Sequence, residues 1–513
     1  MARKPQLLMI FVVVGLFAAG AALLAGTRPV DGDEGYYAGA ARLTASGLVP
    51  YGDFFYPQTP VLPYVYAPFS GPGGGSLVGL RMVSVAAAAL GLLLLGSFLR
   101  RMYGSQSWLP VAGVLLVALD PHFLSWNVTV KTYALANLGV FGVLWALGRG
   151  WQTRSVRWFA GAGVMAGLVV GVRLLYAVWA GALVLAVAVT YLVRERPRRP
   201  GAVTGLIGGL VLGTAPVWGL LLRDPDRFMF NNLRYHVLRY SPHDAPGAGP
   251  LDQGLDALAV FAGTVATHPY LLVWLLLAGW GWREVRRGGE GSGPHAWWAA
   301  GFLAYTGTCL LPDPVYPQYF TAAWGPLLVP LAVRGLAALL APTRRRLRPW
   351  LVAGAVVVVL AGLSGFELGV RRTGMDTAEV WSLDHQAKVA AAIERLTRPG
   401  DVVLAFWSGY PFISGRGYLE GMENHFALGI SEQLTLEQKI HYHVVGKELL
   451  MEAFTRQAPA AVVLGGWMHE INTRLDQDHI PVLLEELQRR YEIRELLGEV
   501  KVMTPRREPE PES

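Results

Sequence analysis

The chain has 513 residues, of which 53% are hydrophobic and only 16% are charged, and its mean hydropathy is +0.35. These values exclude a disordered chain, a collagen-like chain and a small disulfide-stabilised fold. Cys309 is the only cysteine, which excludes an internal disulfide and a cysteine-based metal site.

The charges are distributed unevenly along the chain. Residues 1–370 contain 28 basic and 15 acidic residues, a net charge of +13, whereas residues 371–513 contain 16 basic and 22 acidic residues, a net charge of −6. We therefore predict a helical membrane region over 1–370 and a soluble α/β domain over 371–513. The sequence pI of about 9.4 then gives no reason to expect a nucleic-acid partner.

Apolar runs long enough to cross a bilayer predict the membrane region in detail, because a span needs about 20 apolar residues. Arg173 lies near the middle of the apolar stretch 156–193. It favours two short spans that meet at an interface, since a charge at the bilayer centre is costly. About eleven spans are expected, at 7–27, 76–99, 108–125, 128–148, 156–172, 175–193, 201–222, 258–282, 295–311, 319–341 and 349–370.

The basic residues predict the orientation of these spans. With the N-terminus in the cytoplasm, the loops on that side contain 18 Lys and Arg residues and the opposite loops contain 8. Cytoplasmic loops carry the excess of basic residues. The sequence therefore predicts a multi-pass protein of the cell membrane with segments 28–75, 223–257 and 312–318 and the tail outside the cytoplasm.

The tail has the pattern of a small α/β domain. A helical period over 377–397 is followed by a buried strand at 401–407. Thr435 is the expected N-cap of the next helix. The remaining expected elements are a helix at 436–457, a strand at 460–464, a helix at 480–490 and a hairpin of 492–496 with 499–504.

The first outer loop is the most informative segment. Three acids, Asp31, Asp33 and Glu34, follow the first span directly, and residues 34–47 have the spacing of a short amphipathic helix at the membrane interface. The aromatic- and proline-rich segment 51–69 suits the headgroup zone. Either the loop is acidic and solvated, or it supplies a general base that faces a lipid-borne substrate.

At these residues the chain resembles the GT-C glycosyltransferases, in the branch of protein O-mannosyltransferases and lipid A aminoarabinose transferases. The resemblance rests on Asp33-Glu34-x-Tyr36-Tyr37 after the first span, on the segment from Gly47 to Asp53, on the span pattern and on the outer tail. Members of the family transfer a sugar, with inversion, from a polyprenyl phosphate to an acceptor outside the cytoplasm.

The resemblance implies roles for residues of this loop. Asp33 would deprotonate the acceptor hydroxyl, Glu34 would be a supporting acid, and Tyr36 and Tyr37 would contact substrate. Close relatives often have Lys or His before a Pro-Pro pair in this loop. This chain has Gln58-Thr59-Pro60 there, which makes Gln58 the candidate substrate contact.

The leaving phosphate of such a reaction requires cations near the outer interface. Lys131, at the outer end of the fourth span, and Arg173, at the expected junction of spans, are the candidates. Each could instead extend its charge to lipid headgroups. The resemblance favours Arg173, because relatives carry an Arg after a glycine-rich run like residues 161–171.

Two further segments contain candidate substrate contacts. Asp120 is either a second carboxylate of the site or the N-cap of a short outer turn. The motif 312–319 contributes Tyr316, Gln318 and Tyr319, which either hydrogen-bond phosphate or sugar, or belong to an aromatic belt at the interface.

Together these features predict an inverting glycosyltransferase whose helices contact membrane lipids. It would transfer a sugar from a polyprenyl-phosphate donor to a lipid, cell-wall glycan or protein acceptor. The alternatives are a transporter or flippase of lipid-linked substrates and a non-catalytic scaffold with the same fold. No residue pattern implies a cofactor or a metal site, although a divalent metal ion is compatible with the reaction.

Overall fold

The computed structural model describes residues 3–71, 75–104, 107–195, 197–239, 250–287, 292–312, 315–341, 354, 360, 380–465 and 479–506. The chain forms two compact units. We call residues 1–25, 82–219 and 242–370 the helical unit, and residues 26–81, 220–241 and 371–513 the α/β unit. The α/β unit thus contains two segments that the sequence places in outer loops, in addition to the predicted domain 371–513.

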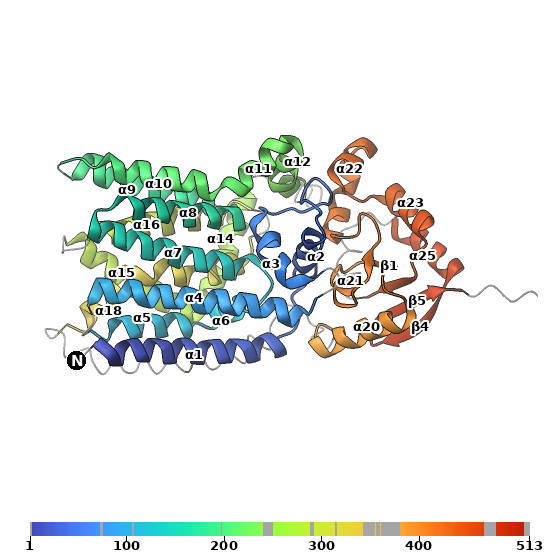
Figure 1. The fold of residues 1–513 in the computed structure, drawn as a ribbon, viewed down its shortest axis with the longest axis horizontal. Coiled ribbons are helices and arrows are strands. Elements are labelled where there is room, and N and C mark those ends of the chain that lie inside the picture. The colour runs from blue at the N-terminus through green and yellow to red at the C-terminus, as the bar shows by residue number, and fades with distance from the viewer. Residues whose placement is uncertain are drawn as a thin grey trace, which may run out of the picture. The chain divides into compact units, whose positions relative to one another are not determined.

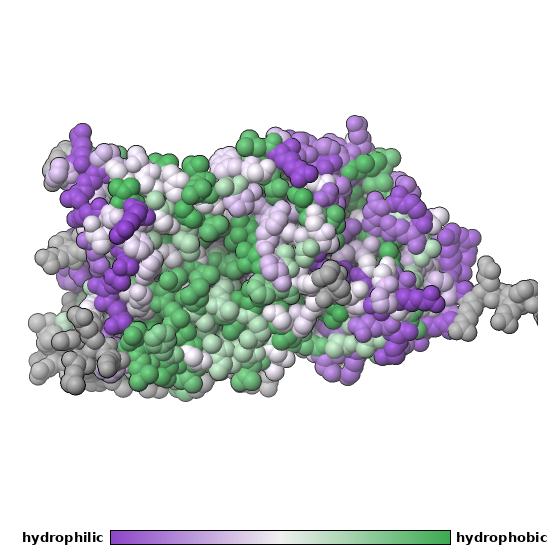
Figure 2. All heavy atoms as spheres, viewed as in Figure 1, coloured by the Kyte–Doolittle hydropathy of each residue, from purple (hydrophilic) through white to green (hydrophobic). Residues whose placement is uncertain are grey.

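The helical unit is built from long apolar helices (Figure 1). Figure 2 shows apolar residues gathered along these helices, with hydrophilic residues at one end of the unit. Its elements, some of which begin or end in the α/β unit, are α1 (Arg3–Thr27), α4 (Leu77–Tyr103), α5 (Leu109–Ala118), α6 (Pro121–Trp126), α7 (Thr132–Thr153), α8 (Val156–Val172), α9 (Tyr176–Ala188), the π-helix η1 (Val189–Arg194), α10 (Pro200–Gly213), α11 (Ala215–Arg223), α14 (Pro250–Thr267), α15 (Pro269–Arg286), α16 (Ser292–Thr308), α17 (Gln318–Thr321) and α18 (Trp324–Leu339).

Most expected spans are found as helices, but several are interrupted. The expected span 201–222 is divided into α10 and α11, which are bent by 53° at Thr214, and the expected span 319–341 is divided into α17 and α18. The expected span 258–282 is wrong as a single helix, because α14 and α15 meet at His268 with a bend of 94°. The expected span 108–125 is likewise divided at Asp120 into α5 and α6. The expected span 349–370 lies outside the described residues, apart from two isolated positions.

Among the described residues, three helices are long and apolar enough to cross a membrane, or five if each bent pair of helices is one span. The three are Pro5–Thr27, Leu77–Tyr103 and Tyr176–Arg194. The number of eleven spans remains a prediction.

Glycines allow α8 and α10 to pack backbone against backbone. A Cβ atom on Gly209 would lie 2.0 Å from the carbonyl oxygen of Ala160, and one on Gly163 would lie 2.1 Å from that of Leu206. Small residues at such interfaces let membrane helices approach closely. The sequence of α10 therefore fixes which of its faces meets α8.

The α/β unit contains a five-stranded sheet in the order β2-β1-β3-β5-β4. Strand β1 is parallel to β2 and β3, whereas β5 is antiparallel to β3 and β4. The strands are β1 (Val402–Ala405), β2 (Gly417–Tyr418), β3 (Ala461–Leu464), β4 (Tyr491–Leu497) and β5 (Val500–Pro505). The helices are α2 (Glu34–Ala45), α3 (Val61–Ser70), α12 (Pro225–Met229), η2 (Phe230–Arg234), α13 (Tyr235–Leu238), α20 (Leu383–Leu396), α21 (Gly409–Ile413), η5 (His425–Gln433), α22 (Leu436–Tyr442), α23 (Lys447–Gln457) and α25 (His479–Arg490).

The expected strands and terminal hairpin of the tail are confirmed, and so is the N-cap at Thr435, which forms a capping box with Gln438. The expected helix 436–457 is wrong as one element. It ends at Tyr442, where His443 adopts a positive φ of 55°, and resumes as α23.

One hydrophobic core joins the segments 26–81 and 220–241 to the tail. Phe55 from the first loop and Phe230 and Tyr235 from the segment 220–241 pack in the same cluster as Leu404 and Phe406 of the tail. Helix α2 is confirmed as a helix, but Glu34 to Arg42 are all buried because it packs against α3 and α21. It therefore does not lie exposed along an interface, as its amphipathic spacing had suggested.

The adjacent glycines Gly208 and Gly209 provide a test of the α8–α10 contact. Gly209→Ala should lower the melting temperature, since the added methyl meets the Ala160 carbonyl and overpacking costs about 1–3 kcal/mol. Gly208→Ala should leave it unchanged or raise it slightly, because no atom of the described residues lies within 4 Å of the new Cβ. Thermal unfolding in detergent, followed by intrinsic fluorescence, measures both; equal melting temperatures would contradict the packing.

Candidate active site

The acidic turn after α1 is held by its own side chains. The Asp33 amide donates to a carboxylate oxygen of Asp31 (3.1 Å), and the Asp31 amide donates to a carboxylate oxygen of Glu34 (2.9 Å). Asp33 occupies the N-cap of α2, but its side chain does not cap the first turn of that helix. The Asp33 carboxylate is half-buried.

Arg81, near the start of α4, forms a bidentate ion pair with Glu34. Its Nε donates to Oε1 (2.9 Å) and its Nη2 to Oε2 (2.6 Å), and both side chains are fully buried. The same guanidinium donates to the carbonyls of Arg28 (2.9 Å) and Pro29 (3.2 Å). Arg81 thus binds the chain on both sides of Asp31, and the Glu34 carboxylate, expected as a supporting acid, serves to fix the turn.

Sequence reasoning missed Arg81, although a signal was present. It is an arginine inside the expected apolar span 76–99, where a charge is expensive unless it is paired. Glu34 was the obvious partner, because it lies in the acidic turn on which the family resemblance rests.

The tyrosines of α2 lie in an aromatic cluster of the α/β unit. The rings of Tyr36 and Tyr37 are 4.1 Å apart, and the Tyr56 ring is 6.3 Å and 6.4 Å from them. The tail contributes Phe426, whose ring meets that of Tyr36 edge-on at 5.4 Å. Arg239 places its guanidinium 5.3 Å from the centre of the Phe426 ring.

The loop after α2 offers two buried hydroxyls. The side chains of Tyr56 and Thr59 are fully buried, and their hydroxyls find no hydrogen-bond partner among the described residues. A buried hydroxyl without a partner costs roughly 1–3 kcal/mol, so these groups are suited to a polar ligand or water. Sequence reasoning chose the neighbouring Gln58, whose carbonyl accepts from the Tyr51 hydroxyl (2.6 Å) and whose side chain is half-buried.

The rest of the α/β unit holds this loop in place. Asn231 accepts from the Tyr56 amide (3.0 Å). The carbonyl of Gly52 accepts from Arg227 (2.9 Å) and lies 2.7 Å from Nε2 of His443. Burial lowers the pKa of His443, which favours the neutral ring and hence the Nε2–H tautomer as donor.

The two expected cations belong to the helical unit. Lys131 lies at the start of α7 and Arg173 at the end of α8. Lys131 is the N-cap of α7, buried, with its ammonium 5.2 Å from the centre of the Trp126 ring. Arg173 follows α8 directly in extended conformation and donates to the Thr132 hydroxyl (3.1 Å). The expected break in the stretch 156–193 is therefore confirmed at Arg173, between α8 and α9.

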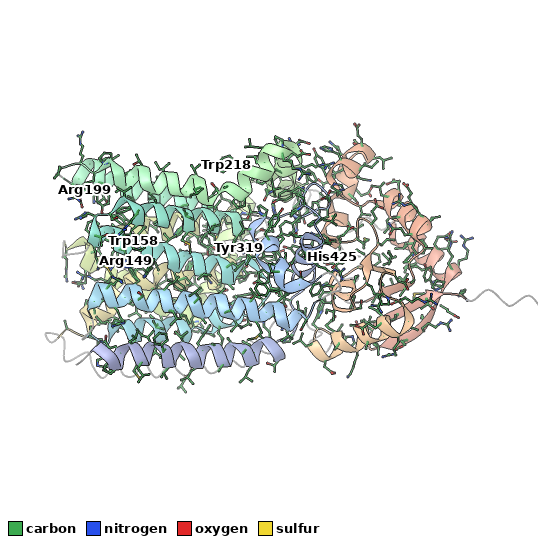
Figure 3. All side chains as sticks on the ribbon, viewed as in Figure 1. Arg149, Trp158, Arg199, Trp218, Tyr319 and His425 are labelled. Atoms are coloured by element: carbon green, nitrogen blue, oxygen red, sulfur yellow. The ribbon has the colours of Figure 1, made fainter. Side chains whose placement is uncertain are left out.

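The motif 312–319 reaches the same cation. The guanidinium of Arg173 lies 4.8 Å from the centre of the Tyr133 ring and 4.9 Å from that of Tyr319, which is labelled in Figure 3. The Tyr316 and Tyr319 rings meet edge-on at 5.7 Å. Gln318, which begins α17, is half-buried beside them in the chain. Segments far apart in the sequence thus converge on Arg173.

Asp120 is an N-cap. One carboxylate oxygen accepts from the amides of His122 (2.9 Å) and Phe123 (3.3 Å) at the start of α6, and the other accepts from the Trp274 indole (2.8 Å). The side chain is fully buried. The structure thus favours the N-cap over the alternative of a second site carboxylate, and we do not include Asp120 in the proposed site.

Within the described ranges, no group of three or more His, Cys, Asp or Glu side chains has the arrangement of a metal site. His441 lies 3.3 Å from Asp226, whereas His443 faces the Gly52 carbonyl.

Comparison with known proteins identifies the fold. The family of dolichyl-phosphate-mannose-protein mannosyltransferases matches residues 57–219. The crystal structure of ArnT from Cupriavidus metallidurans in the apo state superposes with a TM-score of 0.68 at 15% identity, covering 96% of this chain and 97% of ArnT. The chain has the GT-C glycosyltransferase fold.

Further structures have the same GT-C fold. ArnT bound to undecaprenyl phosphate matches with a TM-score of 0.67 at 15% identity over 96% of this chain and 97% of ArnT. An oligosaccharyltransferase from Archaeoglobus fulgidus, solved with zinc and sulfate, matches with a TM-score of 0.50 at 16% identity over 94% of this chain and 71% of its own. No curated protein sequence matches the chain. The expected resemblance is confirmed, although the family match begins after the acidic turn.

The Arg81–Glu34 pair predicts a large loss of stability when one partner is removed. Arg81→Met should destabilise the protein by about 3–5 kcal/mol, because the Glu34 charge remains buried without its partner. The double variant Arg81→Met with Glu34→Leu should recover part of the loss. Arg234→Met is the matched control, since Arg234 and Asp226 form an exposed pair worth about 0–1 kcal/mol. Equal melting temperatures for Arg81→Met and Arg234→Met would contradict the role of Arg81.

Proposed function

We propose that the protein is an inverting glycosyltransferase of the cell membrane that moves a sugar from a polyprenyl-phosphate donor to an acceptor hydroxyl outside the cytoplasm. The GT-C fold over almost the whole chain supports a transferase, and the ArnT structure solved with undecaprenyl phosphate supports a lipid-linked donor. The segments predicted to lie outside, 28–75 and part of 223–257, fold into one unit with the tail, which supports a common side for all of them.

The observation that carries the proposal is the geometry of the acidic turn. Of its two neighbouring acids, Glu34 is committed to Arg81, whereas Asp33 is half-buried and is not used to cap α2. Asp33 is a carboxylate on a rigid support, as a general base requires.

The proposed reaction is a single displacement. Asp33 takes the proton of the acceptor hydroxyl as its oxygen bonds to the anomeric carbon of the donor sugar. The bond from that carbon to the phosphate oxygen breaks, and polyprenyl phosphate leaves with the electron pair. Attack opposite the leaving group inverts the configuration at the anomeric carbon.

Arg173 and Lys131 are the proposed partners of the donor phosphate. Arg173 is held by the Thr132 hydroxyl and two tyrosine rings, and Lys131 lies against the Trp126 ring. A planar guanidinium can contact two phosphate oxygens at once. Cations fixed in advance stabilise the charge that develops on the leaving group.

A non-catalytic scaffold and a flippase predict different results in one assay. Purified protein is incubated with a panel of polyprenyl-phosphate sugars, and hydrolysis or transfer of the sugar is measured. Only a transferase cleaves the bond between sugar and phosphate.

Asp33→Asn tests the base. The change keeps the shape but removes the basicity, so transfer should fall by about 10²–10⁴-fold, while donor binding and the melting temperature should be nearly unchanged. Asp53→Asn is the control, because Asp53 is an exposed carboxylate of the same loop. Normal turnover by Asp33→Asn would remove the main support for the proposed function.

Arg173→Ala tests the phosphate contact. Donor affinity should fall by about 10-fold or more, as expected from the loss of a charge-assisted hydrogen bond worth about 1.5–3 kcal/mol. Arg173→Lys should restore the affinity only in part, since lysine lacks the planar guanidinium that contacts two phosphate oxygens at once. Arg149→Ala is a matched control, because Arg149 also lies over two aromatic rings, Trp145 (5.2 Å) and Trp158 (4.4 Å) (Figure 3). Wild-type donor affinity in Arg173→Ala would rule out the contact.

A further inference from the structure

Helix α2 presents two opposite faces. With 3.6 residues per turn, positions three, four and seven apart share a face of a helix. The proposed base and the residues Tyr36 and Tyr37 lie on one face. The opposite face consists of Gly35, Gly39 and Arg42.

The second face is shaped to receive the tail. A Cβ atom on Gly35 would lie 2.6 Å from Nε1 of Trp407 and 2.7 Å from the Gly409 amide nitrogen. One on Gly39 would lie 2.7 Å from the Tyr418 hydroxyl. These glycines therefore form a groove into which side chains from the segment after β1 fit.

Arg42 fastens the far end of α2 to the same segment. Its guanidinium donates to the carbonyls of Pro411 (2.9 Å) and Arg416 (2.9 Å) and lies 4.4 Å from the centre of the Tyr418 ring. Helix α2 is thus fixed to the tail along its whole length.

The tail also binds the acidic turn directly. The indole Nε1 of Trp407 donates to the carbonyl of Gly32 (2.9 Å), the residue between Asp31 and Asp33. The amide of Val30 donates to the carbonyl of Trp381 (2.7 Å). Two backbone groups of the turn are therefore held by residues more than 340 positions away in the chain.

Trp407 is itself rigidly placed. It follows β1, which pairs with both β2 and β3, and its side chain is fully buried. Its ring meets those of Trp381 (5.3 Å) and Tyr410 (4.9 Å) edge-on. The donor that reaches Gly32 thus projects from the sheet of the tail and not from a mobile loop.

We infer that Trp407 is a positioning residue for the base Asp33, so that the C-terminal domain takes part in catalysis. The inference rests on the proposed function. Glu34 and Arg81 fix the turn on one flank, and Trp407 fixes the peptide that immediately precedes Asp33. A base that is displaced by about 1 Å loses much of its effect, up to roughly 100-fold in rate.

Trp407→Phe tests this role, because phenylalanine keeps an aromatic ring in the groove but has no N–H to donate. We expect kcat to fall by about 10- to 100-fold, with the KM for the donor unchanged. Hydrogen exchange should become faster at the amides of residues 31–37 and stay slow in β1 and β3. Trp218→Phe is the control, since it also removes an indole hydrogen bond, to Thr214 (2.8 Å), on α11 (Figure 3).

Gly35→Ala provides a second variant in case Trp407→Phe does not fold, which exchange in β1 and β3 would reveal. Its methyl group must displace Trp407, so it should reproduce the fall in kcat and the faster exchange at 31–37. Gly15→Ala in α1 is its control, because no described atom lies within 4 Å of the new Cβ.

The outcomes separate this inference from the proposed function. If wild-type protein transfers sugar and both variants keep wild-type kcat and exchange at 31–37, the inference is overturned and the function stands. A higher KM for the donor with unchanged kcat would also overturn the inference, because Trp407 would then act on donor binding. If the wild-type protein transfers no sugar from any donor, the proposed function fails, and with it the role of Trp407 in catalysis.

Discussion

A charge buried away from water must have a partner, and in the α/β unit this requirement is met by Arg81 and Glu34. The pair does more than neutralise two charges. Because the same guanidinium also binds two carbonyls of the chain entering the turn, it converts a flexible acidic loop into a fixed one. Everything proposed for Asp33 depends on this, since a base acts only if its position is defined before the substrate arrives.

Helix α2 and its N-cap residue Asp33 together have three tasks. Asp33, at the N-cap, is the proposed base, and Glu34 forms the ion pair with Arg81. Gly35, Gly39 and Arg42, on the opposite face, contact the tail. The proposed function therefore assigns only part of the motif that resembles the GT-C family to catalysis. In this chain Gly35 and Glu34 serve the support of Asp33, which explains why acids, tyrosines and glycines alternate within so short a segment.

The parts of the fold that could be predicted are those with local signals. The apolar runs predicted most helices, the capping residue Thr435 predicted the start of α22, and the charge of Arg173 within the apolar stretch 156–193 predicted the end of α8. The bend at His268 also had a local signal, although hydropathy does not show it. Pro269 follows His268, and the residue before a proline disfavours helical conformation.

The rest of the site depends on contacts between distant segments. The charge of Arg81 inside an apolar run indicates a buried acidic partner, whereas nothing near Gly32 in the sequence points to Trp407. At the break at His443, the ring contacts the Gly52 carbonyl across 391 positions. Such pairings are set by tertiary packing, so the sequence and its family resemblance could single out Asp33 and Arg173 as candidates but could not show what holds them.

The order in which the chain is made has a consequence for the α/β unit. Its core combines Phe55, Phe230 and Tyr235 with residues of the tail, and Trp407 follows Gly32 by 375 positions. At a synthesis rate of about 5–20 residues per second, roughly 20–75 s separate the two residues. During that interval the acidic turn has been synthesised, but Trp407, which fits the groove of α2, has not. The α/β unit therefore cannot complete its core, or the contact of Trp407 with the acidic turn, until the tail has been synthesised.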